Sequence, residues 1–112
     1  MGVLKEAREL VEQGWAIGHY HVSDSDGRET FCALGALERA AAGDMGVLRN
    51  ANEALAAQLP YGWRQGEYTT ERIWSYNDYF PAMALLSARL AMGRRKKKVL
   101  RLFDRAIEKQ RG

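Results

Sequence analysis

The sequence predicts a mostly α-helical protein, a compact bundle of about five to six helices with at most one small β-hairpin near residues 15–31. Apolar residues recur at helical spacing through most of the chain, and glycine, proline or capping residues separate the periodic segments. With 112 residues, 46% of them hydrophobic and 28% charged, we expect one globular domain over residues 1–112.

The first quarter of the chain predicts a helix followed by the hairpin. A helix is expected over residues 3–13, where apolar residues fall every three or four positions before Gly14. Residues 15–22 then alternate between two faces, as a strand does. The turn signal DSDG at 24–27 leads to a short return strand over residues 28–31.

Two helices are expected next, each with a capping residue before it. Thr30 is the predicted N-cap of a helix over residues 31–42, and Asp44 is the predicted N-cap of a helix over residues 45–59. Pro60 ends the second of these helices. Both caps would satisfy backbone N–H groups that a helix leaves without an internal partner.

The rest of the chain predicts a loop and three helices. Residues 61–68 form the loop, and Thr69 or Thr70 caps a short helix. Asp78 is the predicted cap of a further helix over residues 79–92. Gly93 ends that helix, and a last helix follows over residues 96–109, with an apolar face at Val99, Leu100, Phe103, Ala106 and Ile107.

Charge is unevenly distributed, with an acidic body and a basic end. Ten of the 17 Lys and Arg residues lie from residue 89 onward, where the acidic residues are Asp104 and Glu108. This segment therefore carries a charge of +8 and the first 88 residues carry −5, which together give the net charge of +3. Five cations open the predicted last helix: Arg94, Arg95, Lys96, Lys97 and Lys98. Cations at a helix N-terminus oppose the helix dipole. The run therefore predicts an anionic partner: nucleic acid bound through its phosphates, an acidic protein surface, or the acidic body itself.

The single cysteine, Cys32, is the candidate nucleophile, because a helix N-terminus lowers the pKa of a thiol. The groups available as its base and orienting partner are His19, His21, Asn77 and Asp78. The favoured interpretation is a buried core residue, since the neighbours of Cys32 are apolar and no nucleophile motif surrounds it. His19 and His21 are spaced to share a zinc ion, but Cys32 or Asp24 would have to supply its third and fourth ligands, and two half-exposed surface histidines are the favoured interpretation. We therefore expect neither an enzyme, nor a metal, nor a cofactor.

Aromatic residues gather within one short stretch of the chain. They are Tyr61, Trp63, Tyr68, Trp74, Tyr76, Tyr79 and Phe80. Because Tyr and Trp dominate the energetics of protein interfaces, this stretch predicts a protein-binding surface. The residues expected to contact a protein partner are Trp63, Tyr68, Tyr76 and Tyr79.

Four segments carry a family resemblance: GW at 14–15, FCALGAL at 31–37, YND at 76–78 and VLRLFDRAI at 99–107. They resemble a family of small uncharacterised proteins of actinobacteria and their phages, with a Cys-Ala-Leu-Gly-Ala-Leu helix and a Trp-Asn-Asp triplet. Tyr76 stands where that family has Trp. The resemblance implies an actinobacterial or phage setting and no reaction. Its motif positions here are Cys32, Gly35, Asn77 and Asp78.

We interpret these motif positions as structural rather than catalytic. Asn77 and Asp78 can end one helix and cap the next, and Gly35 would allow a close crossing of its helix against the last one. On this interpretation the side chains of Asn77 and Asp78 stabilise the fold and take no part in a reaction.

The leading hypothesis is a small non-enzymatic binding protein, encoded by a phage, that engages a host or phage protein. The alternative is a nucleic-acid-associated protein that uses residues 94–98, and the third is an enzyme dependent on Cys32. No apolar stretch approaches the roughly 20 residues of a membrane span, and the charged start of the chain is not a secretory signal, so we expect a cytoplasmic protein without membrane partners.

Overall fold

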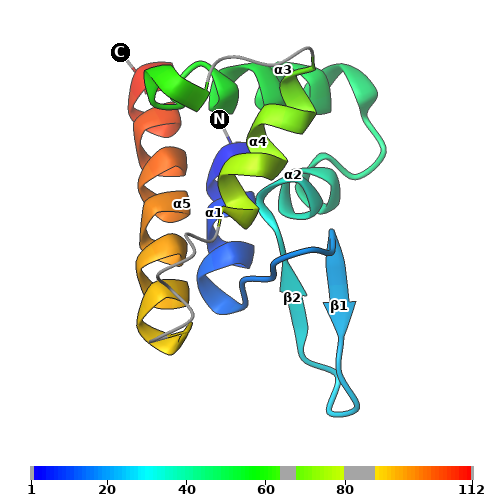
Figure 1. The fold of residues 1–112 in the computed structure, drawn as a ribbon. Helices are drawn as coiled ribbons and strands as arrows, with labels where there is room; N and C mark the ends of the chain where they lie inside the picture. The colour runs from blue at the N-terminus through cyan, green and yellow to red at the C-terminus, as the bar shows by residue number, and fades with distance from the viewer. Residues whose placement is uncertain (1, 64–67, 80–87, 112) are drawn as a thin grey trace.

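The computed structural model describes residues 2–63, 68–79 and 88–111, which form five α-helices, one short 3-10 helix and one two-stranded hairpin (Figure 1). The helices are α1 (Gly2–Gln13), α2 (Ala33–Ala41), α3 (Met45–Ala56), α4 (Thr69–Asp78) and α5 (Ala88–Arg111), with η1 (Tyr61–Trp63) between α3 and α4. The strands are β1 (His21–Ser23) and β2 (Glu29–Phe31). The predicted fold class is confirmed.

Helices α1 and α5 lie side by side and run in opposite directions, α3 crosses one end of both, and the hairpin projects at the other end (Figure 1). Helix α1 also packs along α2, and α4 packs against α2, α3 and α5. The largest fully buried side chains include Leu4, Leu37, Leu55, Leu59, Ile73, Leu102 and Phe103. They come from every helix and from the segment after α3, so one core serves all the described elements.

The hairpin is shorter than predicted. The strand expected over residues 15–22 is wrong: only its end lies in β1, which pairs antiparallel with β2 through His21–Phe31 and Ser23–Glu29. Trp15 forms an isolated parallel bridge with Phe31 instead. Between them the chain turns at Gly18, whose φ of +81° lies in the left-handed region and interrupts any extended strand.

The predicted cap Asp44 is confirmed, whereas the predicted caps of α2 and α4 are wrong. Asp44 caps α3 through its side chain, as predicted. The cap of α2 is Cys32 rather than Thr30, because Phe31 pairs in β2 and the helix begins two residues later than expected. Neither predicted threonine caps α4, since its N-cap is Tyr68, which makes no capping bond through its side chain. Helix α3 ends at Ala56 and not at residue 59.

The end of the chain also differs from the prediction. Gly93 does not end a helix, because α5 runs through it for 24 residues. Asp78 is the last residue of α4 and caps no helix at Tyr79, where the backbone is extended. Of the helix predicted over residues 79–92, residues 80–87 lie outside the described part of the chain. The basic run therefore lies within a helix, and the argument from the helix N-terminus no longer applies.

Candidate functional site

The resemblance motif forms one hydrogen-bonded cluster centred on Asn77, which is 1% exposed. Its Oδ1 accepts a hydrogen bond from Nε1 of Trp15 at 2.8 Å and from the backbone N–H of Ala33 at 3.0 Å. Its Nδ2 donates to the carbonyl of Ala16 at 3.0 Å and to Oδ1 of Asp78 at 2.7 Å. One amide thus ties the end of α4 to the start of α2 and to the chain after α1.

Asp78 extends this cluster along the same loop. Its second carboxylate oxygen accepts a hydrogen bond from the backbone N–H of Gly18 at 3.0 Å. The carboxylate and the Asn77 amide together hold residues 16–18, which belong to no strand or helix. Residues 16–18 are therefore positioned by the end of α4.

Cys32 and Gly35 complete the cluster from the side of α2. The backbone N–H of Cys32 donates to the carbonyl of Tyr20 at 3.2 Å, and its Sγ accepts from the N–H of Gly35 at 3.4 Å. Gly35 lies against the Tyr20 carbonyl, so the expected close crossing with the last helix is wrong: the close approach is to the loop. All four motif residues hold this loop in place.

The environment of Cys32 opposes the nucleophile hypothesis. The side chain is fully buried, and burial raises the pKa of its thiol, while the Gly35 N–H favours the thiolate less strongly. A raised pKa leaves the thiol protonated near neutral pH. His19 and His21 are both exposed, and His21 pairs with Glu29 at 3.1 Å. The charge of Asp78 raises the pKa of the Cys32 thiol further, and both oxygens of that carboxylate already accept hydrogen bonds, from Asn77 and Gly18.

His21 belongs to a separate cluster on the hairpin. Its ring stacks on Phe31, with 4.9 Å between the ring centroids, and the Arg39 guanidinium lies 5.1 Å from the same Phe31 ring. The two terminal nitrogens of that guanidinium, Nη1 and Nη2, each donate to a carboxylate oxygen of Glu29 at 3.2 Å. Over residues 2–63, 68–79 and 88–111, no three His, Cys, Asp or Glu side chains gather closely enough to hold a metal ion.

The four predicted aromatic contacts do not form one exposed surface. Tyr76 is 5% exposed, so it is part of the core and unavailable to a partner. Trp63 is half-buried and lies edge-on to the rings of Tyr76 and Tyr79. Tyr79 and Tyr68 are exposed. Phe80 lies outside the described residues.

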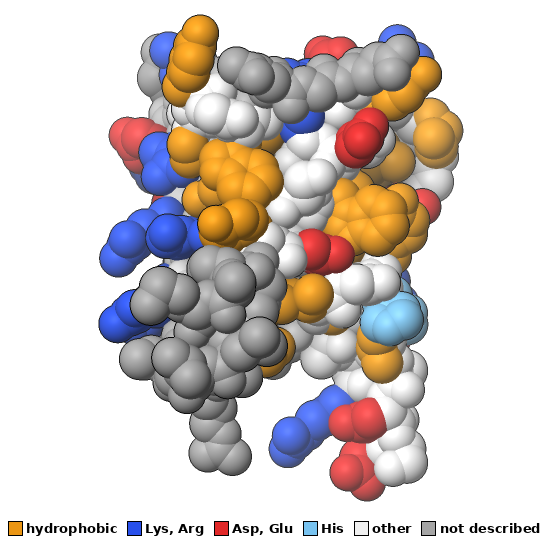
Figure 2. Space-filling view, viewed as in Figure 1, with side chains coloured by type: hydrophobic (Ala, Val, Ile, Leu, Met, Phe, Trp, Pro, Cys, Tyr) orange, Lys and Arg blue, Asp and Glu red, His pale blue; other side chains and the backbone are white. Residues whose placement is uncertain are grey.

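A second aromatic pair lies on the other side of α4. Tyr20 and Trp74 are 48% and 41% exposed, and their ring centroids are 5.8 Å apart. Figure 2 shows apolar side chains gathered to both sides of α4 on this face. The sequence contained Trp74 within the aromatic stretch, but gave no signal that Tyr20 would meet it. Only the structure reveals this meeting, through the hydrogen bonds of Asp78 and Asn77 to the loop that carries Tyr20.

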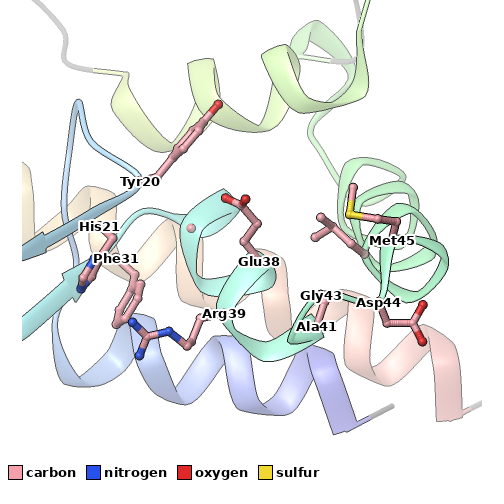
Figure 3. A pocket seen from close by; sticks show the side chains of 11 residues that line it. Tyr20, His21, Phe31, Glu38, Arg39, Ala41, Gly43, Asp44 and Met45 are labelled. Carbon is pink, nitrogen blue, oxygen red and sulfur yellow. The ribbon is translucent and has the colours of Figure 1, made fainter.

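A hollow of about 300 Å³ borders Tyr20 of this pair, between the hairpin, α2 and the start of α3. Tyr20, Glu38 and Met45 reach its rim from three different segments (Figure 3). Met45 is 67% exposed, and the carboxylate of Glu38 forms no ion pair with any described residue. We call Tyr20, Trp74, Met45 and this hollow the aromatic face.

The basic run is partly built into the fold. Arg95 is 7% exposed, donates to the carbonyl of Tyr76 at 3.0 Å, and lies against the rings of Tyr76 and Tyr79 at 4.9 and 5.1 Å. Lys96 donates from Nζ to the carbonyl of Glu12 at 2.8 Å, near the end of α1. Arg95 is therefore buried in the fold, and Lys96 is half-buried with its ammonium group held at the end of α1. The exposed members are Arg94, Lys97 and Lys98.

The arrangement defines a small helical domain whose motif residues position a loop. The chain belongs to the family of unknown function DUF6197, which it matches over residues 2–109. No curated protein and no solved structure shows significant similarity to this chain. Among the described helices, none is long and apolar enough to cross a lipid bilayer.

Proposed function

We propose that this protein is a small non-enzymatic binding protein that holds a partner protein against its aromatic face. The observation that carries the proposal is the Tyr20–Trp74 pair. Two large aromatic side chains stay 48% and 41% exposed although the motif hydrogen bonds fix the loop that presents one of them. Rigid, half-exposed Tyr and Trp side chains are typical anchors of protein interfaces.

The charges around the aromatic face favour a partner segment that is apolar and basic. Glu71 is exposed and lies one turn before Trp74 on α4, and Glu38 borders the hollow without an ion-pair partner among the described residues. Arg39, at the same hollow, is already paired with Glu29. A Lys or Arg of the partner beside an apolar anchor would complement this arrangement.

The partner is proposed to be a host or phage protein in the cytoplasm, following the resemblance to small proteins of actinobacteria and their phages. Burial of Cys32 and its raised thiol pKa support a non-enzymatic role. An enzyme dependent on Cys32 is the competing proposal. It requires rapid labelling of Cys32 in the native protein and turnover that Cys32→Ser abolishes.

A pull-down with matched variants tests the proposal. The immobilised protein is incubated with nuclease-treated actinobacterial lysate, in parallel with Tyr20→Ala, Trp74→Ala and the control Tyr61→Ala. Tyr61 is 80% exposed and lies in η1, outside the aromatic face. We expect a protein that the wild type and Tyr61→Ala retain and that both face variants lose.

Calorimetry with the captured protein then measures the effect. Each face variant should weaken binding roughly tenfold or more, the loss of about 1.4 kcal/mol typical of an aromatic anchor. Glu38→Gln with Glu71→Gln should mainly lower the association rate and its dependence on salt. Equal binding by all variants, with each of them folded, would contradict the proposal.

A further inference from the structure

Helix α5 carries a second charged surface, distinct from the aromatic face. Five cations follow one another at intervals of three or four residues along it: Arg94, Lys98, Arg101, Arg105 and Lys109. This spacing keeps them on one side of a helix. They extend over 16 residues, and the 15 steps between the first and the last give a length of about 22 Å at 1.5 Å per residue. We call these five residues the α5 basic stripe.

Packing on the opposite side of α5 makes the stripe face solvent. Val99, Leu102, Phe103 and Ala106 are fully buried in the core, and all five stripe residues are exposed. Figure 2 shows Lys and Arg side chains along the edge of the molecule that α5 occupies. Arg95 points into the fold, and its bond to the Tyr76 carbonyl fixes the rotation of the helix.

The carboxylates near the stripe leave most of its charge uncompensated. Asp104 pairs with Arg8 of α1, so it is engaged away from the stripe. Within the described residues, no stripe cation forms an ion pair with a carboxylate. Arg105 donates to the carbonyl of Gln58 at 3.4 Å, and Glu108 is the one acid on this side of α5 from residue 94 to 111.

We propose that the α5 basic stripe binds the phosphate backbone of double-stranded nucleic acid without sequence preference. A straight row of like charges about 22 Å long complements the regular phosphates of a duplex. The stripe contains no aromatic side chain, so it offers no stacking platform for single strands. A membrane surface is less suitable, because the apolar face that an interfacial helix inserts is, in α5, already buried in the core.

The salt dependence of binding should report the number of stripe residues in contact. If all five cations contact phosphates, log K should fall with log salt with a slope of about −4.5. Removing three of them should flatten this slope by about 2.7. Affinity in low salt should be micromolar, as expected for contacts to phosphates alone.

The test is fluorescence anisotropy with a labelled DNA duplex of mixed sequence, titrated at several salt concentrations. The stripe variant carries Arg94→Gln, Lys98→Gln and Arg101→Gln. The control carries Lys5→Gln, Arg28→Gln and Arg49→Gln, three exposed cations on α1, the hairpin turn and α3. Both variants lower the formal net charge from +3 to 0.

We expect the stripe variant to lose roughly tenfold or more in affinity at low salt, with the flatter slope, and the control to stay within about threefold of the wild type. Equal losses in the two variants would show that overall charge, not the stripe, drives binding. Absence of wild-type binding at low salt, or tighter binding to anionic vesicles or polyglutamate than to the duplex, would also overturn the proposal. None of these outcomes bears on the protein partner of the aromatic face.

Discussion

The carbonyl of Tyr20 occupies the space that a side chain on Gly35 would need. A Cβ added to Gly35 would lie 1.8 Å from that oxygen, inside any permitted contact distance. The same carbonyl accepts the N–H of Cys32 at 3.2 Å, so it has little freedom to retreat. The loop before the hairpin and the first turn of α2 are thus packed backbone against backbone.

Two glycine variants should have opposite effects on stability. Gly35→Ala should lower the free energy of unfolding by about 3 kcal/mol or more, because the loop must move away from α2. Gly93→Ala should raise it by about 0.5–1 kcal/mol, since Gly93 lies inside α5 with no atom near the added methyl. Urea unfolding of both variants measures the two changes in the free energy of unfolding. A stable Gly35→Ala protein would contradict the backbone contact.

Loss of the Asn77 amide should be among the most damaging single changes. Asn77→Ala leaves the Ala33 N–H, the Ala16 carbonyl and the Trp15 indole N–H without their partner. The free energy of unfolding should fall by about 3–5 kcal/mol, because each unpaired buried polar group costs about 1 kcal/mol or more. Asn50→Ala, on the exposed side of α3, is the control and should change stability by less than about 0.5 kcal/mol. Similar unfolding midpoints for the two variants would rule out the central role of Asn77.

Cys32 should behave as a capping residue. Since Sγ accepts the Gly35 N–H, serine can replace this bond and alanine cannot. We expect Cys32→Ala to cost about 1–2 kcal/mol and Cys32→Ser to cost less than that. Thermal unfolding ranks the two variants, and a greater loss with serine would indicate a purely apolar role. In the wild type, a thiol reagent should react slowly before denaturation and rapidly after it.

The neighbouring residues Arg94 and Arg95 of the basic run should differ sharply in how much each contributes to stability. Arg95→Gln should cost about 2 kcal/mol, because it removes the bond to the buried Tyr76 carbonyl and the contact with the Tyr76 and Tyr79 rings. Arg94→Gln should change stability by less than about 0.5 kcal/mol, since Arg94 is exposed. Chemical denaturation of the two variants makes the comparison. Equal stability would mean that the run acts only as charge.

The hairpin should respond to acid through Glu29. The Arg39 guanidinium beside it holds the pKa of this carboxyl below its ordinary value, with a smaller contribution from His21. Because this pKa is lower in the folded than in the unfolded protein, the stabilising contribution is present above the ordinary carboxyl range. It is lost as the pH falls through the folded value. An NMR titration should show the Glu29 pKa rising in Arg39→Gln, and an unchanged pKa would disprove the pairing.

Local sequence patterns correctly predicted the elements whose ends are set by residues nearby in the sequence. The first helix and the Asp44 cap were predicted because an apolar stripe, a following glycine and a capping carboxylate are all local signals. Gly93 misled the prediction because glycine only weakens a helix. In α5 the buried contacts of Arg95 and Val99, which follow Gly93 in the helix, outweigh that cost.

The candidate sites depend on contacts between distant parts of the chain, which composition does not reveal. Tyr20 meets Trp74 because Asp78 holds the loop at Gly18, a relationship that spans 60 residues. Tyr76 belongs to the aromatic stretch in sequence but to the core in space. Cys32, Gly35, Asn77 and Asp78, which the resemblance singled out, lie together in the structure, and their contacts with this loop are visible only in three dimensions.

The hydrogen bonds of Asn77 also constrain the order in which the protein can mature. Its partners Trp15, Ala16 and Ala33 precede it by 62, 61 and 44 residues. A ribosome adding about 5–20 residues per second completes α1, the hairpin and α2 some seconds before α4 exists. During that interval the nascent chain carries amide groups whose partner has not been synthesised. Stable structure must therefore await the second half of the chain, and the partly made protein is the stage most open to proteases and chaperones.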